Sequence, residues 1–257
     1  MEEQDYRTTY ELEGHNWWFV GMRRTCTEWV ARCLARPTAA APVRPPRILD
    51  VGCGTGINIE AFERFGPTVG LDRSSTALAF CRERGRTDLV QADGVRLPFP
   101  DGAFDVVTAI GVVEHIEADR AALAEWARVL APGGRLVLLT SAYQWMWSGH
   151  DTSNHHVRRY TTRQVRSMLA AAGLGEVRSS YVNCFLFPPI AVVRLVERAM
   201  RRGRPPAPHK DTGEVPGPAN RLLVALLGLE ARLLRRTDLP FGVSMVASGI
   251  RSGTSSG

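Results

Sequence analysis

Three aspartates lie at the ends of three short apolar segments, and a glycine-rich turn follows the first of them. Asp50 precedes the turn Gly52–Gly56, which reads Gly-x-Gly-x-Gly, while Asp72 and Asp93 end the next two apolar segments. Such a turn lets backbone amides approach a ligand closely and directs a helix N-terminus toward it. A carboxylate at Asp72 can accept from both hydroxyls of a ribose, and one at Asp93 from an adenine amino group.

The glycine turn differs from the fingerprint of dinucleotide-binding proteins, because Ile57 stands where that fingerprint has a glycine. The three acids therefore predict a nucleoside site rather than a pyrophosphate site. The alternative for the turn by itself is a plain strand–helix connection that binds no ligand.

The segments around these acids alternate between apolar runs typical of strands and amphipathic runs typical of helices. Helices are predicted at Ile57–Arg64, Ser74–Arg84 and Arg120–Leu130, and strands at Arg47–Val51, Thr68–Leu71, Leu89–Ala92, Phe104–Ile110, Arg135–Thr140, Val177–Val182 and Val243–Ile250. This alternation predicts an α/β fold with a doubly wound, mostly parallel sheet of seven strands. The carboxyl ends of parallel strands meet at one edge, which brings the three acids together.

Four stretches in this order, LDVGCGTG, VGLDRS, QADGVRLPFPDGAFDVVTAIGVVEHI and RVLAPGGRLVLLT, resemble the successive motifs of class I S-adenosylmethionine-dependent methyltransferases. The resemblance covers residues 47–140 densely and implies a Rossmann-like fold whose last strand is antiparallel. It also implies S-adenosylmethionine as cofactor and S-adenosylhomocysteine as product. The residues that it places around the cofactor are Asp50, Gly52, Gly54 and Gly56 at the methionine part, Asp72 at the ribose, Asp93, Gly94 and Val95 at the adenine, and Ile110 and Gly111 near the amino group.

Methyl transfer needs little from a protein beyond in-line positioning and, for some acceptors, a base that takes a proton. His115 follows the fourth predicted strand and is either this base or a structural part of the cofactor shelf. The loop Ser148–Tyr160 supplies two further candidates, His150 and His155, unless it is only a solvated polar loop. No metal is predicted, because His150, Asp151 and His155 match no zinc-site spacing.

Aromatic and arginine residues are predicted to contact the acceptor. Trp17, Trp18 and Phe19 form either a lid over the cofactor or part of the core. Tyr143, Trp145 and Trp147 follow the fifth predicted strand, and their rings either line a wall of the acceptor pocket or simply continue the strand. Arginines in the 148–160 loop either grip an anionic acceptor or pair with acids. This loop and His15–Phe19 resemble a bacterial subgroup found in polysaccharide, lipid and natural-product pathways. The predicted acceptor contacts are Trp18, Tyr143, Trp147, Arg158, Arg159 and Tyr160.

The composition bounds the class of protein. The chain has 257 residues, of which 44% are hydrophobic, enough for a buried core and too many for general disorder. No apolar run reaches the roughly 20 residues that a bilayer span requires, and Met1–Tyr10 lacks the features of a secretory leader. Five scattered cysteines without a CxxC pair favour reduced thiols and a cytoplasmic location.

The formal charge of +6 resides in one segment, residues 186–236, which has ten basic and four acidic residues. Two basic amphipathic helices are expected there, Ile190–Arg202 and Asn220–Arg236, joined by the proline-rich linker Gly203–Pro218. They could pack on the sheet or form a homodimer contact, cover an apolar acceptor as a lid, or anchor the protein peripherally at the inner face of a membrane. Nucleic acid is not expected as a partner, because Ile110–Val113 lacks the Asp/Asn-Pro-Pro-aromatic motif of base methylation.

These observations divide the chain into a helical cap (1–40), a cofactor-binding core (41–185), a basic helical insertion (186–240) and a last strand with its tail (241–257). The predicted function is in-line transfer of a methyl group from S-adenosylmethionine to a small-molecule acceptor at oxygen or nitrogen. The alternative acceptor is lipid-linked or membrane-presented. Two alternatives of another class are a nucleoside-binding protein without turnover and a membrane-associated scaffold.

Overall fold

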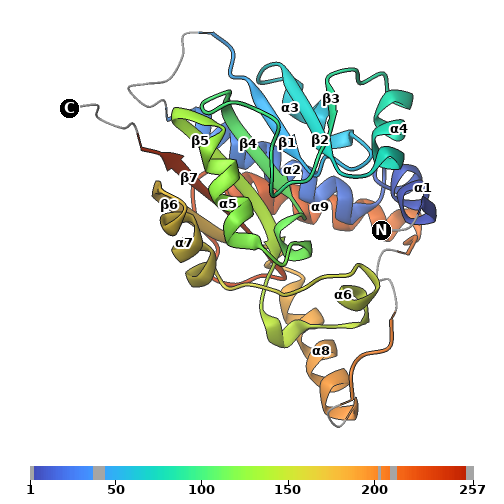
Figure 1. The fold of residues 1–257 in the computed structure, drawn as a ribbon. Helices are drawn as coiled ribbons and strands as arrows, with labels where there is room; N and C mark the ends of the chain where they lie inside the picture. The colour runs from blue at the N-terminus through green and yellow to red at the C-terminus, as the bar shows by residue number, and fades with distance from the viewer. Residues whose placement is uncertain (1–2, 37–43, 202–203, 209–212, 253–257) are drawn as a thin grey trace.

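A seven-stranded sheet forms the centre of the protein in the computed structural model, which describes residues 3–36, 44–201, 204–208 and 213–252 (Figure 1). The strands are β1 (Ile48–Val51), β2 (Thr68–Asp72), β3 (Leu89–Gln91), β4 (Phe104–Ile110), β5 (Leu130–Ser141), β6 (Leu174–Val182) and β7 (Ser244–Arg251). Their order across the sheet is β3-β2-β1-β4-β5-β7-β6.

The pairing of the strands confirms the predicted doubly wound, mostly parallel sheet. β3, β2, β1, β4 and β5 pair in parallel, whereas β7 is antiparallel to both β5 and β6. Asp50 of β1 lies opposite Gly70 of β2 and Thr108 of β4, so the carboxyl ends of the three strands share one edge. This edge is where open α/β sheets bind their ligands.

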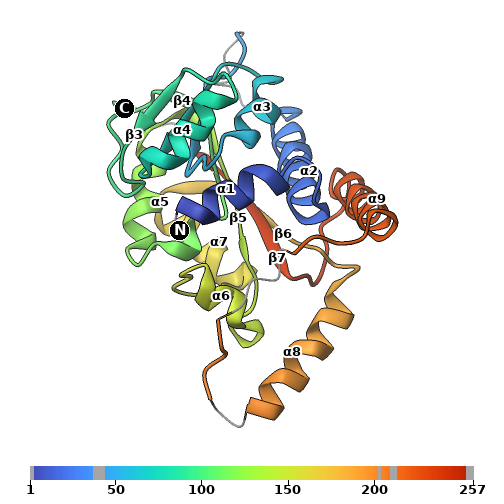
Figure 2. The ribbon, with the colours of Figure 1, turned by 90° about the vertical axis from the view of Figure 1, so that its right-hand side faces the viewer.

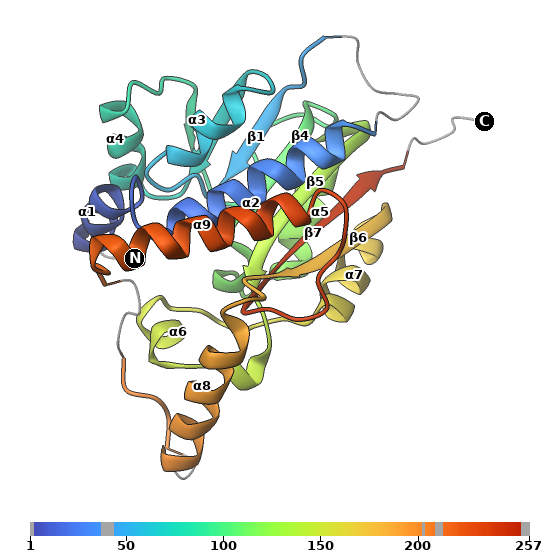
Figure 3. The ribbon, with the colours of Figure 1, turned by 180° about the vertical axis from the view of Figure 1, so that it is seen from behind.

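Helices cover both faces of the sheet (Figures 2 and 3). They are α1 (Glu3–Leu12), α2 (Trp17–Leu34), α3 (Ile57–Glu63), α4 (Ser75–Glu83), α5 (Asp119–Arg128), α6 (Gly149–Ser153), α7 (Thr162–Ala171), α8 (Phe187–Arg201) and α9 (Gly217–Leu233). α5 and α7 pack in the apolar cluster on one face, through Trp126 and Leu169 among others. α2, α3 and α9 pack in the cluster on the other face, through Trp29, Phe62 and Leu227. Because helices cover both faces of the sheet, the strands have apolar side chains on both faces.

Helix α7 is an element that the sequence prediction missed. It begins with a capping box in which the Thr161 side chain accepts from the Gln164 amide and the Gln164 side chain accepts from the Thr161 amide. Val165 and Leu169 are buried, one helical turn apart, against the sheet. A Thr-x-x-Gln start before an apolar periodicity is the signal that identifies such a helix.

The two helices of the basic segment have different surroundings. α9 lies beside α2 on the same face of the sheet (Figure 3). Leu227 of α9 packs so tightly on Gly21 of α2 that a Cβ at position 21 would lie 2.2 Å from Leu227 Cδ1. α8 projects from the body of the molecule, and none of its 15 residues, all of which the structure describes, is buried (Figure 2). The predicted positions Arg202, Gly203 and 209–212 of the helix end and linker lie outside the described residues.

The base of α8 is fixed by a buried carboxylate on α9. Glu230 accepts hydrogen bonds from the backbone amides of Asn183, Cys184 and Phe185, which directly precede α8. Burial raises the pKa of Glu230, and these three amides oppose that effect. Among the residues that the structure describes, no helix combines the length and the apolar character needed to cross a bilayer.

If α9 is a packing helix, Leu227→Ala should destabilise the protein. Leu227 is 1% exposed, so its truncation leaves a cavity and should lower the free energy of unfolding by about 2–5 kcal/mol. Leu222→Ala, a matched control on the same helix where the side chain is 70% exposed, should change it by less than about 0.5 kcal/mol. Urea unfolding followed by circular dichroism measures both. Equal effects of the two substitutions would contradict the packing.

Candidate cofactor and acceptor site

The end of β2 and the turn after β1 are joined through the carboxylate of Asp72. Its Oδ2 accepts from the Gly54 amide at 3.0 Å, and its Oδ1 accepts from the Ser74 amide at 2.9 Å. A carboxylate offers about four lone-pair positions, so two remain for further donors. The geometry therefore leaves Asp72 able to accept from a vicinal diol while it holds the turn in place.

The three glycines of the turn serve two different purposes. All have positive φ, at +67° for Gly52, +57° for Gly54 and +87° for Gly56, which glycine adopts at little cost. A Cβ on Gly52 would lie 2.5 Å from Val112, and one on Gly56 would lie 2.9 Å from Cys81, so these two allow close packing. A Cβ on Gly54 would meet no atom within 4 Å. Gly54 is thus the position at which the turn faces open space.

Asp50 is a buried acid with one unsatisfied oxygen. Thr108 donates to its Oδ1 at 2.7 Å, whereas Oδ2 is buried with no hydrogen-bond partner among the described residues. Burial raises the pKa of Asp50 to about 7, and the negative charge of Asp72 acts in the same direction. Such an oxygen is expensive to leave without a partner. It fits a site that a cationic or N–H-bearing ligand group completes, as the ammonium of S-adenosylmethionine would.

The next strand ends complete the edge. Asp93 is exposed after β3, and its Oδ1 accepts from the Val95 amide at 3.0 Å. The indole of Trp126 donates to the carbonyl of Gly94 at 2.8 Å and so fixes this loop from the core. Beyond Ile110, Gly111 has a φ of +69°, and a Cβ there would meet no atom within 4 Å. The predicted cofactor residues therefore lie on successive strand ends of one edge.

Helix α1 covers this edge, through residues that the sequence prediction did not identify. Glu13 follows α1 and accepts from the Thr55 hydroxyl of the glycine turn and from Arg84 Nη2, the latter at 2.7 Å. Arg84 also donates to the Thr55 carbonyl at 3.0 Å. Burial raises the pKa of the Tyr6 hydroxyl, as does the nearby charge of Asp72. Residue spacing gave no signal for these contacts, because they join segments distant in the sequence.

The 148–160 loop is organised by the carboxylate of Asp151, which is fully buried. Arg159 grips both of its oxygens, with Nε to Oδ1 at 2.7 Å and Nη2 to Oδ2 at 3.0 Å. His156 Nδ1 lies 2.8 Å from Oδ1, and the Ser148 amide donates to Oδ2 at 2.8 Å. Despite burial, these partners hold the pKa of Asp151 well below its usual range. His156 was not singled out from the sequence, where no spacing rule pairs it with Asp151.

The three predicted base candidates differ in their placement. His115 is 4.7 Å from His156 between ring centroids, and a hydrogen bond joins its ring to the backbone of His155. His115 is exposed, and its pKa is lowered by desolvation and by the neighbouring His156, an effect that Glu114 opposes. His150 Nε2 lies 3.0 Å from the side-chain amide of Asn154. The His155 side chain itself is exposed, on a backbone with a φ of +55°.

A cavity of about 380 Å³ lies at the carboxyl edge, between the start of α2, the end of β5 and α8. Its apolar lining comes from Trp17, Trp18, Met146, Pro189, Ile190, Val193 and Val243, and its polar lining from Ser141, His150, Arg159, Arg194, Glu197 and Ser244. Mostly apolar walls with a few polar groups are typical of a small-molecule site. Among the described residues, no group of three or more His, Cys, Asp or Glu side chains is placed so that it could hold a metal ion.

The other predicted acceptor residues are not among those that line the cavity. Tyr143 stacks on Tyr181 with ring centroids 4.9 Å apart, at the base of α8. Trp147 is half-buried. Tyr160 is 2% exposed, and its hydroxyl donates to Asp119, so this ring belongs to the core. Arg158 also donates to Asp119, at 3.1 Å, which corresponds to the alternative in which the loop arginines pair with acids.

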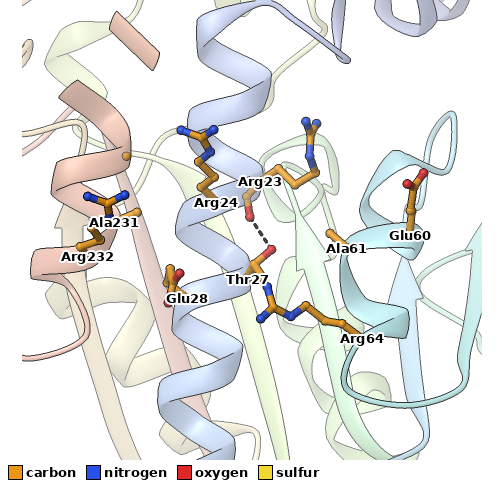
Figure 4. A pocket seen from close by; sticks show the side chains of 10 residues that line it. Arg23, Arg24, Thr27, Glu28, Glu60, Ala61, Arg64, Ala231 and Arg232 are labelled. Carbon is orange, nitrogen blue, oxygen red and sulfur yellow. Dashed lines mark hydrogen bonds between the residues drawn. The ribbon is translucent and has the colours of Figure 1, made fainter. Parts of the chain in front are cut away.

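A second hollow, of about 460 Å³, lies between α2, α3 and α9 (Figure 4). Its lining includes Arg23, Arg24, Arg64 and Arg232, together with Glu28 and Glu60. It is formed by the second half of α3 and not by the glycine turn at the start of that helix. The groove therefore has mixed charge and contains none of the predicted site residues.

Comparison with known proteins agrees with this geometry. Residues 49–138 match the model of the methyltransferase domain family. The probable S-adenosylmethionine-dependent methyltransferase of Mycobacterium tuberculosis is 30% identical over 175 residues, which cover 66% of this chain and 60% of that relative. The ubiquinone biosynthesis O-methyltransferase of Thiobacillus denitrificans is 40% identical over 128 residues, 47% of this chain and 50% of its own length. The chain thus spans 60% or less of these relatives.

The fold agrees as well. A SAM-dependent methyltransferase of Thermotoga maritima superposes with a TM-score of 0.56 at 15% identity, over 97% of this chain and 96% of that one. S-adenosylmethionine is the cofactor of this family, and the open turn at Gly54 and the unsatisfied Asp50 are suited to it. Residues 49–138 thus form a domain of the methyltransferase family, and the motifs, the sheet and these relatives support its assignment to the class I S-adenosylmethionine-dependent methyltransferases.

Proposed function

We propose that this chain transfers a methyl group from S-adenosylmethionine to the oxygen or nitrogen of a small-molecule acceptor. The observation that carries the proposal is the Gly54–Asp72 hydrogen bond, because it forms a nucleoside-binding edge beside the cavity of about 380 Å³. When bound, S-adenosylmethionine supplies a sulfonium methyl group for in-line displacement. The protein then has to hold the two reactants in line, exclude water and receive a proton.

The residues predicted for the cofactor keep those roles in this proposal. Asp72 accepts from the ribose hydroxyls, and Asp93 with Gly94 and Val95 borders the adenine. Asp50, Gly52, Gly54, Gly56, Ile110 and Gly111 surround the methionine part. Helix α1 closes over this edge through Glu13 and Arg84, which supports its role in excluding water.

The acceptor occupies the cavity beneath Trp18, with its reactive atom toward the strand ends. We assign the proton-accepting role to His115, which follows β4 at the carboxyl edge outside the lining of the cavity, because one ring nitrogen is engaged with the His155 backbone and the lowered pKa favours the neutral ring. His150 contacts the acceptor from the cavity wall, and its Nε2 is already paired with Asn154. The buried Asp151–Arg159 pair holds the loop that presents His150, whereas His115 lies outside this loop, after β4.

Asp72→Ala tests cofactor binding. Two charge-assisted hydrogen bonds to the ribose should be lost, so the affinity for S-adenosylhomocysteine should fall about 100-fold or more in isothermal titration calorimetry. Asp101→Ala is the matched control, since that carboxylate is exposed and pairs with Arg128 away from the turn. An Asp72→Ala protein that keeps its circular dichroism spectrum and its affinity would refute the cofactor assignment.

Asp50→Asn tests the buried acid through pH. The pKa of about 7 in the folded protein exceeds the value of 3.8 expected when unfolded, so ionising Asp50 costs stability as pH rises from about 4 to 7. The free energy of unfolding of Asp50→Asn relative to wild type should therefore increase by about 2 kcal/mol between pH 5 and 8, without ligand. The same substitution should weaken S-adenosylhomocysteine binding. A pH-independent difference would contradict the raised pKa.

His115→Ala tests the base. Release of S-adenosylhomocysteine with a panel of phenols, catechols and primary amines should fall about 100-fold, while calorimetric affinity for S-adenosylhomocysteine is kept. The wild-type rate should decline only below pH 6.5, because the pKa of His115 is lowered. His155→Ala is the control, as only the backbone of His155 contacts His115. Full turnover by His115→Ala would remove His115 as the base.

A further inference from the structure

Helix α8 has its charged side turned toward the protein and its apolar side turned outward. Arg194, Glu197 and Arg201 are all partly buried and form ion pairs along the inner side, with Glu197 to Arg194 at 3.1 Å and to Arg201 at 2.6 Å. This is the reverse of a helix packed on a globular core, whose apolar stripe faces inward. Packing among the residues that the structure describes therefore does not explain the outer face of α8.

The outer face is a continuous aliphatic surface. Val192, Val196 and Met200 follow one another at helical spacing and are 60%, 51% and 72% exposed. Val193 and Leu195 beside them are also more than half exposed. α8 projects from the body of the molecule (Figure 2), its base is held by Glu230 and by ring contacts of Phe187, and this face is exposed among the described residues. Exposed apolar patches of this kind mark a surface that contacts another protein or a membrane.

Charge and size favour a membrane surface over a second copy of the chain. Arg198 is exposed beside the aliphatic face, and Arg204 is exposed just beyond the helix end, so cationic groups border it. A stable protein–protein interface needs about 20–30 residues on each side, several times more than one face of this helix provides. A basic-edged apolar helix in the plane of the interface is what binding to an anionic bilayer requires.

The outer face also continues into the acceptor cavity. Pro189 and Val193 line the cavity and are at the same time exposed on α8. An acceptor embedded in the interface would pass along these two residues to reach His150 without crossing water. We propose that α8 docks on an anionic membrane surface through Val192, Val196 and Met200, and that the acceptor is an amphiphile delivered from that surface. The second part rests on the proposed methyl transfer, whereas the docking stands without it.

Vesicle co-sedimentation of the full chain tests the docking directly. Wild-type protein should bind vesicles of equal parts phosphatidylglycerol and phosphatidylcholine at physiological ionic strength, and bind vesicles of phosphatidylcholine at least tenfold less. The double substitution Val192→Glu and Val196→Glu should lower binding to the anionic vesicles at least tenfold. Leu222→Glu is the matched control, since Leu222 is equally exposed but lies on α9, and it should bind as wild type does.

Three results would overturn the proposal: no binding of the wild-type protein, equal loss in the Leu222→Glu control, or full binding of the double variant. A wild-type dimer in sedimentation that the double substitution dissociates, without vesicle binding, would instead assign the face to a second copy. Calorimetric affinity for S-adenosylhomocysteine should be unchanged in all three proteins, because Val192, Val196 and Leu222 lie outside the cofactor edge. If the wild-type protein did not bind S-adenosylhomocysteine, this would count against the proposed methyl transfer but would leave the docking result valid.

Discussion

The hydrogen bond from the Gly54 amide to the Asp72 carboxylate holds together the part of the molecule on which the rest depends. The turn has three positive φ angles and an internal backbone hydrogen bond from the Gly56 amide to the Cys53 carbonyl, so the Gly54 amide needs an acceptor outside the turn. Asp72 can act as this acceptor because β1 and β2 are adjacent and parallel. The same carboxylate is then rigidly placed for a ligand, which links fold stability to cofactor recognition at one side chain.

A second buried carboxylate organises the acceptor side in the same way. Asp151 gathers Arg159, His156 and the Ser148 amide, so a loop with little regular structure is held by ionic hydrogen bonds rather than by an apolar core. Both carboxylates thus have many donors and a fixed geometry. Asp50 differs from Asp151, because one of its oxygens has no partner among the described residues and its pKa is raised, whereas that of Asp151 is lowered. The contrast separates acids that maintain the structure from the acid that a ligand would complete.

The parallel direction of most strands, and the gathering of Asp50, Asp72 and Asp93 at one edge, could be predicted because alternating local patterns determine a doubly wound sheet. The antiparallel last strand followed only from the family resemblance. The contacts of Glu13 with Thr55 and Arg84 could not, since nothing in either segment marks its partner. Periodicity predicted an amphipathic basic helix in the segment that forms α8. It could not tell which side faces the protein, because that depends on the Arg194–Glu197–Arg201 ion pairs and on the cavity beneath them. Helix α7 could have been predicted, because the sequence contains its capping-box signal at Thr161 and Gln164. The helix was missed because this signal was not recognised.

The place of β7 between β5 and β6 has a consequence for biosynthesis. β7 follows all the other strands along the chain, yet β6 has no hydrogen-bonded neighbour in the sheet except β7. While the chain emerges from the ribosome, β1–β5 can therefore assemble the nucleoside edge early, but β6 and the exposed side of β5 wait for the last strand. α2 likewise stays uncovered until α9 has been made. Maturation of this protein is thus a late insertion into a preformed half-sheet, a step at which the unpaired edge of β5 is open to misassociation with other chains.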